Sequence, residues 1–224
     1  GFLREIRRGH GVQGLMAVIL CYGDSNTHGT RPVERLGEFR RYPPGDRWPD
    51  AMAAALPGHT VIAEGLPGRT TVHDDAIDGG TRNGLTVLPA VLGSHVPLDL
   101  VILMLGTNDL KPRYAVTAFE IARSLERLTR IVRAEAPGAD ILLVAPPPVA
   151  PAGVQAPVFA GAEARQATLP AEIAAAADRL GCGFVDAGPH VAVSEIDGIH
   201  WEAGAHRAFG AVMARAVAGR LGSA

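Results

Sequence analysis

The sequence predicts a single α/β domain, a three-layer sandwich in which a parallel sheet of about five strands carries helices on both faces. Short apolar runs alternate along the chain with longer segments of helical periodicity, as expected for repeated strand–helix–strand units. Residues 100–105 form an uninterrupted apolar run, which is typical of a strand buried on both faces of a parallel sheet. With right-handed crossovers, these elements would form a flavodoxin-like sheet.

The predicted strands are short segments of apolar residues that are followed by turns. They are residues 17–22, 60–64, 98–105, 140–145 and 183–186. The predicted helices lie between and after the strands, at residues 47–56, 84–92, 115–136, 161–180 and 202–221. Irregular insertions at residues 31–45 and 146–159 are expected to shape a pocket or a subunit contact, because long loops at the functional end of a sheet usually do so.

Length and composition fit one domain. The 224 residues, of which 47% are hydrophobic, can bury one sizeable core, and we assign residues 16–224 to it. Residues 1–15 are expected to be an extension, a cloning remnant or an arm onto a neighbouring subunit. The net charge of −2 gives no electrostatic reason to expect nucleic acid or an anionic membrane as a partner. No apolar stretch reaches the roughly 18 residues of a membrane span.

Cysteine and histidine usage indicates neither a disulfide framework nor a metal site. The two cysteines, Cys21 and Cys182, predict no structural disulfide, which is compatible with a cytoplasmic protein. The run from His73 to Asp75 offers adjacent ligand-type side chains without ligand spacing, so a solvated loop is the favoured interpretation. His206 is expected on the surface of a helix.

The first candidate functional residue is Ser25, in the segment Gly-Asp-Ser-Asn-Thr that directly follows the first predicted strand. A serine in a tight turn at the exit of a buried strand is held with its hydroxyl outward, which suits a nucleophile. The same residues are also ordinary turn chemistry. The pattern Gly-x-Ser-x-Gly is absent around Ser25, which argues against an α/β-hydrolase elbow.

A second candidate is the pair Asp197 and His200. A serine hydroxyl needs a base to remove its proton, and the base needs a carboxylate to fix its tautomer. An aspartate three residues before a histidine can meet both needs from one loop, with Gly198 allowing the chain to turn. The alternative is an acidic turn that caps the helix beginning near Trp201.

Asn108 and Gly68 also follow predicted strands. Asn108 is expected one strand away from Ser25, where its amide could donate to the oxyanion of a tetrahedral intermediate. The alternative for Asn108 or Asp109 is a cap or turn role. The glycine loop at residues 64–71 exposes backbone N–H groups, so Gly68 could add an oxyanion donor. Its spacing does not match a nucleotide-binding loop.

Taken together, Ser25, Gly68, Asn108 and His200 occur in the order and contexts that characterise the SGNH (GDSL-type) hydrolase superfamily. The chain resembles this superfamily from about residue 16 onward, and residues 64–71 and 99–109 resemble its bacterial arylesterase/acyltransferase branch. The resemblance implies a flavodoxin-like fold and a serine esterase, with Ser25, Asp197 and His200 as catalytic triad. It further implies an oxyanion hole formed by Ser25, Gly68 and Asn108, and no metal or organic cofactor.

The expected substrate is a small-molecule short-chain or aryl ester, with acyl transfer to alcohols or peroxide as a further activity. Assembly into a homo-oligomer is also expected from the resemblance. Candidate pocket residues are Asp24, His28, Phe159, Ile199 and Trp201, of which Phe159 and Trp201 could equally be packed in the core. The alternatives are a carbohydrate O-acetylesterase, less favoured because only 5% of residues are aromatic, and a non-catalytic flavodoxin-like binding module.

Overall fold

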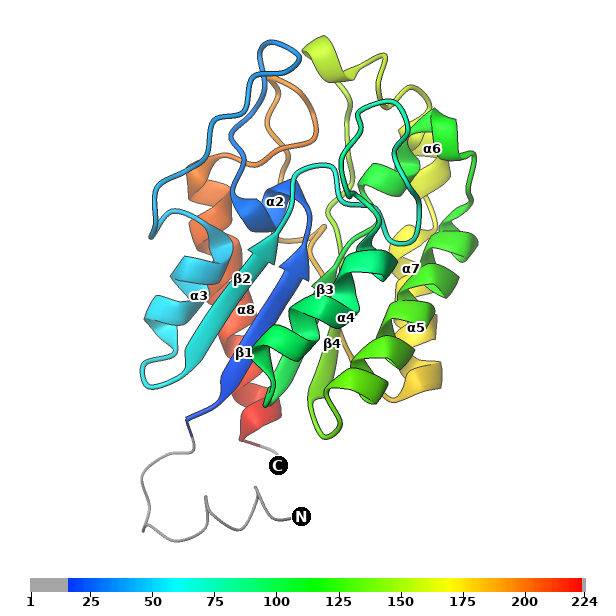
Figure 1. Cartoon of the computed structure of the whole chain (residues 1–224). Coiled ribbons are helices and arrows are strands. Elements are labelled where there is room, and N and C mark those ends of the chain that lie inside the picture. The colour runs from blue at the N-terminus through cyan, green and yellow to red at the C-terminus, as the bar shows by residue number, and fades with distance from the viewer. Residues whose placement is uncertain (1–15, 223–224) are drawn as a thin grey trace, which may run out of the picture.

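The computed structural model describes residues 16–222, which form one parallel sheet between two layers of helices (Figure 1). The predicted extension at residues 1–15 lies outside the described residues. The order of the strands is β2-β1-β3-β4-β5, and every neighbouring pair is parallel. This is the flavodoxin-like order, so the predicted fold class is confirmed. The strands are β1 (Val18–Gly23), β2 (Thr60–Gly65), β3 (Leu100–Met104), β4 (Asp140–Ala145) and β5 (Gly183–Asp186).

Alternate side chains along the strands enter two separate cores, because successive residues of a strand point to opposite faces. Leu20 and Tyr22 of β1 belong to the core on one face, whereas Ile19 and Cys21 belong to the core on the other. The first face is covered by α4 (Gly84–His95), α5 (Ala118–Glu135) and α7 (Leu169–Leu180), and the second by α3 (Trp48–Ala55) and α8 (Ala203–Leu221). Cys21 is a buried apolar residue with a free thiol, as its position in the sequence suggested.

The bounds of several helices differ from the sequence prediction, and for two of the predicted helices the reason can be identified. The helix predicted at residues 115–136 begins at Ala118, because Thr117 and Glu120 form a reciprocal capping box at its N-terminus. The helix predicted at residues 161–180 is divided into α6 (Ala162–Gln166) and α7. Pro170 lies in the first turn of α7, where its missing N–H and fixed φ are tolerated, whereas a continuous helix would place it in the interior.

Short elements at the carboxyl ends of the strands were not predicted. The helix α2 (Ser25–His28) follows β1 directly, and the Asp24 side chain caps it by accepting a 2.9 Å hydrogen bond from Asn26 N–H. The loops after β3 and β4 also contain short 3-10 helices, which are η1 (Asn108–Leu110), η2 (Pro112–Tyr114) and η3 (Gly153–Gln155). No helix within residues 16–222 is long and apolar enough to cross a membrane.

The sheet order places the candidate functional loops at one end. Strand β1 lies between β2 and β3, so the loops that leave these three strands are neighbours. The chain continues from β1 to β2 on one side and from β3 to β4 on the other side. Parallel α/β sheets generally bind ligands at the carboxyl ends of the two strands between which the strand order reverses in this way. Ser25 follows β1, Gly68 follows β2 and Asn108 follows β3.

Candidate active site

Ser25 is the first residue of α2 and is almost completely buried. The N–H groups in the first turn of a helix have no acceptor within the helix, and Asp24 takes only the N–H of Asn26. The N–H of Ser25 therefore has no acceptor within α2. Asp24 itself is buried, and burial raises its pKa to about 6 in spite of the hydrogen bond from Asn26 N–H and the nearby charge of His200.

Asp197 and His200 form a buried pair. The distance from His200 Nδ1 to Asp197 Oδ2 is 2.6 Å, and the same oxygen accepts a 2.7 Å hydrogen bond from Val33 N–H. The other carboxylate oxygen accepts hydrogen bonds from the N–H groups of Ile199 and His200, at 3.0 and 2.9 Å. Burial alone would raise the pKa of Asp197, but these hydrogen bonds and the charge of His200 lower it overall. Asp197 is thus a fixed carboxylate that holds the imidazole in one orientation.

The loop that carries His200 is attached to the helix that carries Ser25. Asn26 Nδ2 donates a 3.2 Å hydrogen bond to the carbonyl oxygen of Ile199, and both residues are buried. Within residues 16–222, no hydrogen bond joins Ser25 Oγ to His200 Nε2. Catalytic hydrogen bonds are often long or poorly aligned before substrate binds. The loop attachment nevertheless keeps the two residues in the same small region.

Asn108 is hydrogen-bonded to the loop that contains Gly68. Its Nδ2 donates a 3.1 Å hydrogen bond to the carbonyl oxygen of Arg69, which leaves its second N–H for another acceptor. Gly68 precedes that carbonyl and has a φ of +80°, a conformation that glycine adopts without strain. The structure therefore brings Asn108 to the glycine loop, and both candidate donors face the same end of the sheet.

Two residues that anchor these loops were not recognised from the sequence as part of the site. The buried Asp109 carboxylate accepts hydrogen bonds from Thr71 N–H and the Thr71 hydroxyl, and burial raises the pKa of Asp109. The Arg69 guanidinium donates to the carbonyl oxygens of Gly23, at 2.8 Å, and of Glu64. It also stacks 4.0 Å above the Tyr22 ring. In the sequence, each of the two is only a charged residue near the end of a predicted strand. That position does not distinguish a buried residue that holds loops together from an exposed one.

Three of the expected pocket residues are core residues. Phe159 and Ile199 are packed in the core beneath α4, α5 and α7, and Trp201 is packed in the core beneath α3 and α8. The sequence could not separate pocket lining from core because both are apolar, and the structure selects the core for all three. Ile199 contributes through its backbone, which binds Asn26 and Asp197.

The histidines near the site also differ in environment. His28 is half-buried, its Nδ1 lies 3.0 Å from Thr30 Oγ1, and burial together with Arg41 lowers its pKa to about 4. His206, predicted on a helix surface, is fully buried between Tyr42 and Trp201. That prediction is wrong because His206 lies on the buried stripe of α8, three residues before Phe209.

In the segment from His73 to Asp75, Asp74 is exposed as predicted for a solvated loop, His73 is partly exposed and Asp75 is buried. Asp75 is buried and forms ion pairs with Lys111 and Arg113, at 3.4 and 2.7 Å. Hydrogen bonds such as that from Asp78 N–H, together with the Lys111 charge, outweigh the effect of burial and hold the pKa of Asp75 well below its usual range. Among the described residues, no group of three or more His, Cys, Asp or Glu side chains could hold a metal ion.

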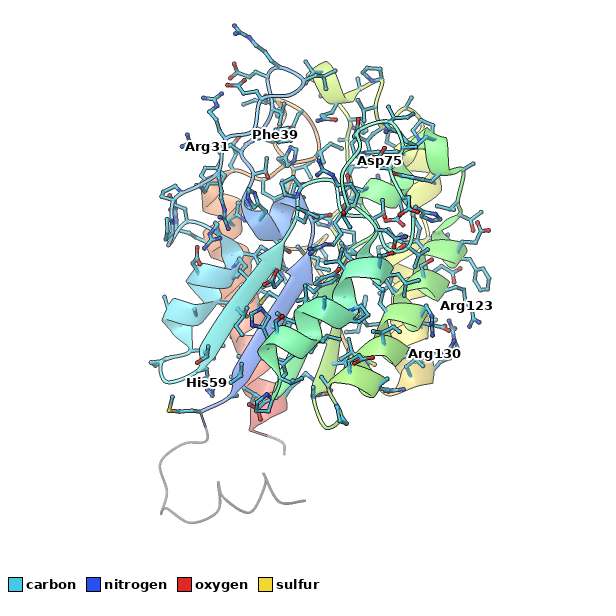
Figure 2. All side chains as sticks on the ribbon, in the orientation of Figure 1. Arg31, Phe39, His59, Asp75, Arg123 and Arg130 are labelled. Atoms are coloured by element: carbon cyan, nitrogen blue, oxygen red, sulfur yellow. The ribbon has the colours of Figure 1, made fainter. Side chains whose placement is uncertain are left out.

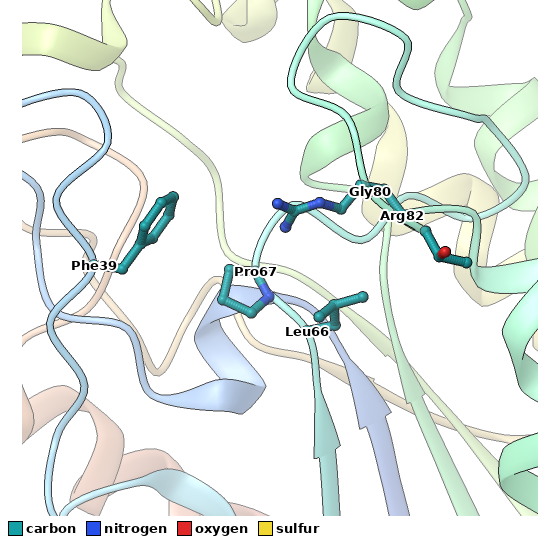
Figure 3. A pocket seen from close by; sticks show the side chains of 6 residues that line it. Phe39, Leu66, Pro67, Gly80 and Arg82 are labelled. Carbon is teal, nitrogen blue, oxygen red and sulfur yellow. The ribbon is translucent and has the colours of Figure 1, made fainter.

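A groove of about 420 Å³ opens beside the glycine loop (Figure 3). It lies between the insertion at residues 31–45 and the loop at residues 72–82. Figure 2 shows Phe39 and Asp75, which belong to these segments, at the end of the molecule opposite His59. The lining residues are Phe39, Leu66, Pro67, Gly80, Thr81 and Arg82.

The chain is similar to known esterases in sequence and in structure. The sequence profile of the GDSL-like lipase/acylhydrolase family matches residues 21–208. Among solved structures, the chain is 39% identical to Est24, a carbohydrate acetylesterase from Sinorhizobium meliloti, over 91% of this chain and 99% of that one, with a TM-score of 0.87. It is 36% identical to the aryl esterase of M. smegmatis, with the same coverage and TM-score. A carbohydrate acetylesterase family member from Sinorhizobium meliloti is 41% identical over 92% and 100% of the two chains, with a TM-score of 0.85. A search of curated proteins found no match.

Proposed function

The chain belongs to the GDSL-like lipase/acylhydrolase family and is a carboxylic ester hydrolase, and from this premise we propose that Ser25, His200 and Asp197 form its catalytic triad. In this mechanism His200 removes the proton of Ser25 as its hydroxyl attacks the ester carbonyl. Asp197 orients the imidazole and stabilises its cation. His200 then protonates the leaving alcohol or phenol, and water hydrolyses the acyl-enzyme.

The observation that carries this proposal is the buried Asp197–His200 pair, on a loop that is hydrogen-bonded to the helix of Ser25. A carboxylate that accepts four hydrogen bonds, one of them from the imidazole, cannot move without losing several contacts. An arrangement of this kind supports an imidazole with a fixed tautomer, which a serine nucleophile requires.

The oxyanion of the tetrahedral intermediate would be stabilised by the N–H groups of Ser25 and Gly68 and by the side-chain amide of Asn108. Each donor belongs to the loop after a different strand, and the three strands are adjacent. Donors held by a rigid sheet edge need little reorganisation as charge develops, which is the basis of this form of catalysis.

The proposed substrates are small short-chain acyl and aryl esters. The 36% identity to an aryl esterase supports this class. The apolar side chains of Leu66 and Pro67 next to Gly68 would contact the hydrocarbon part of an acyl or aryl group. Acyl transfer to an alcohol or to peroxide would follow wherever such a nucleophile replaces water at the acyl-enzyme. Assembly into a homo-oligomer stays a prediction.

A second candidate is carbohydrate O-acetylesterase activity, which the similarity to two carbohydrate acetylesterases favours. The chemistry is the same, and only the alcohol part of the substrate differs. The aryl esterase and carbohydrate O-acetylesterase activities are separated by comparing kcat/KM for phenyl acetate and for a per-acetylated monosaccharide. The acetate ester of the preferred alcohol should have the larger value.

The proposal is tested by the initial rates of the wild type and Ser25→Ala on acetyl, butyryl and octanoyl p-nitrophenyl esters, with and without added alcohol. We expect the variant to lose nearly all activity over background and the rate of the wild type to fall as the acyl chain lengthens. Equal rates for the two proteins would remove Ser25 from the mechanism. A transfer product that increases with the alcohol concentration would establish acyl transfer.

A further inference from the structure

Arg82 presents an unpaired guanidinium to the groove beside the glycine loop. Figure 3 shows its side chain extending over Pro67 toward Phe39. Within residues 16–222, Arg82 forms no ion pair with any carboxylate. A guanidinium is charged at every relevant pH, so an unpaired one in a groove is a ready binding site for an anion.

The position of Arg82 is fixed by the protein. Its Nε donates a 3.1 Å hydrogen bond to the carbonyl oxygen of Gly79, and its own carbonyl oxygen accepts a 3.0 Å hydrogen bond from Thr70 N–H. The first bond occupies Nε and leaves the two terminal nitrogens available. The second joins Arg82 to the segment that begins with Gly68. The guanidinium is therefore oriented before any ligand arrives.

Two acidic residues of the loop that carries Arg82 have other partners. Asp75 and Asp78 belong to the same loop, but both pair with Lys111, at 3.4 and 3.0 Å. Arg113 lies 2.7 and 3.3 Å from the same two carboxylates. The buried Asp75 and the exposed Asp78 are thus both paired with cations from the segment that follows β3, and the Arg82 charge faces the groove.

The rest of the groove is apolar. Leu66 and Pro67 line it, and the Phe39 side chain forms one wall although it is 67% exposed. An aromatic ring with most of its surface exposed at the edge of a groove is available to pack against a ligand. The groove therefore combines an apolar surface with one cation.

The groove is adjacent to the proposed reaction centre. Leu66 N–H donates a 3.1 Å hydrogen bond to the carbonyl oxygen of Gly23, two residues before Ser25. A Cβ added at Gly68 would lie 3.0 Å from Arg82 Nη1, so the guanidinium lies beside the residue whose N–H would bind the oxyanion. A substituent on a substrate bound at the proposed site would therefore extend toward Arg82.

From these contacts we infer that the preferred substrates are esters that carry a carboxylate on their non-reacting part, which Arg82 binds while Phe39, Leu66 and Pro67 contact the apolar portion. The inference rests on the proposed function of the same site. The two terminal nitrogens of a guanidinium match the two oxygens of a carboxylate in a bidentate pair. The carboxylate could belong to the acyl part or to the leaving group.

Two substrate pairs distinguish these sources. In the first, 4-acetoxybenzoate is compared with 4-acetoxybenzamide, so that only the leaving group changes its charge. In the second, the mono-p-nitrophenyl ester of glutaric acid is compared with the same ester in which the free carboxylate is replaced by a neutral carboxamide, so that only the acyl part changes its charge. Each pair is measured with the wild type, Arg82→Gln, Arg82→Lys and the control Arg127→Gln. Arg127 is an exposed arginine on α5 that does not line the groove.

We expect the ratio of kcat/KM for the anionic ester to that for its neutral partner to fall at least about tenfold in Arg82→Gln, mainly through KM, since a hydrogen-bonded charge contributes about this much. Arg82→Lys should retain part of the ratio, because it keeps the charge and loses the bidentate geometry, and Arg127→Gln should not change it. The substrate pair that shows the decrease identifies the part of the ester that Arg82 binds. Circular dichroism shows whether Arg82→Gln folds. If it does not, the test uses Arg82→Lys, in which the ratio of kcat/KM for the anionic ester to that for its neutral partner should be lower than in the wild type.

An unchanged ratio in both pairs, or an equal loss for anionic and neutral esters, would overturn the inference. This result is distinct from failure of the proposed function. In that case the wild type and Ser25→Ala would hydrolyse the neutral esters equally, whatever residue occupies position 82.

Discussion

At the scale of single residues, Asn108 shows how one side chain serves both structure and the proposed chemistry. One N–H of its amide binds the carbonyl oxygen of Arg69, and the other is left for the oxyanion. In Asn108→Ala we expect kcat and kcat/KM to fall together, by about 10²–10³, because the lost donor acts mainly in the transition state. Steady-state kinetics on p-nitrophenyl acetate measure this.

Loss of folding would imitate that result, so the thermal melting of the variant is recorded alongside. Asn108→Asp keeps the shape of the side chain but cannot donate when ionised, and should lose at least as much activity. A variant with nearly normal kcat and a raised KM would contradict the oxyanion role and leave Asn108 a binding residue.

His206 makes stability depend on pH. Within the described residues neither ring nitrogen has a hydrogen-bond partner, and burial with the nearby charge of His200 lowers the pKa of His206 from 6.5 to about 4. The native state therefore keeps the imidazole neutral while the unfolded chain takes up a proton as the pH falls below 6.5. His206 therefore does not lower the free energy of unfolding above pH 6.5, but lowers it by about 2–3 kcal/mol on acidification toward pH 4.

His206→Phe removes the titrating group and keeps an aromatic ring between Tyr42 and Trp201. We expect the free energy of unfolding of this variant, measured in urea between about pH 7 and about pH 4, to fall less than that of the wild type by the amount given above. Parallel curves for the two proteins would show that His206 does not titrate in this range.

At the scale of elements, the loop of the proposed acid and base depends on one glycine. Gly198 has a φ of +70°, and a Cβ added to it would lie 1.7 Å from the carbonyl oxygen of Ala150. The two loops are joined by hydrogen bonds from Ala150 N–H to the Gly198 carbonyl oxygen, at 2.9 Å, and from Ala152 N–H to the Asp197 carbonyl oxygen, at 3.0 Å. The loop after β4 therefore holds Asp197 and His200 in place.

Gly198→Ala should lower the free energy of unfolding by at least about 1–3 kcal/mol and also lower kcat, because the backbone must move to accommodate the methyl group. Gly204→Ala is the matched control, since a Cβ at this helical glycine meets no atom within 4 Å and should leave stability unchanged or raise it. Urea unfolding of both variants checks this. A loss in Gly198→Ala no larger than that in Gly204→Ala would show that the close approach to Ala150 is unimportant.

The elements also show where sequence patterns are sufficient. β4 and β5 have the predicted bounds, because a short apolar run between turns has few alternative structures. The short helix α2 was missed because four residues are too few for a periodic pattern. The break before α7 was signalled by Pro170, but the alanine-rich pattern on both sides favoured one continuous helix.

At the scale of the whole molecule, the sequence predicts how the loops gather but not what fills the space between them. Because β1 and β3 are neighbours, Ser25 and Asn108 belong to adjacent loops, and strand–helix alternation is enough to infer this. Arg69 and Arg82 could not be assigned in this way, since their roles depend on contacts between segments far apart in sequence. Phe159 and Trp201 illustrate the same limit, because an apolar residue near a site is equally compatible with a pocket or a core.

If the imidazole of His200 activates Ser25 as a nucleophile, a fluorophosphonate should react with Ser25 in a manner that depends on His200. The wild type, Ser25→Ala and His200→Ala are incubated with the reagent, and the label is located by mass spectrometry of peptides. We predict one label on Ser25 in the wild type, none in Ser25→Ala and very slow labelling in His200→Ala. A folded wild type that stays unlabelled at Ser25, or labelling that does not depend on His200, would show that the two residues do not form a nucleophile and its base.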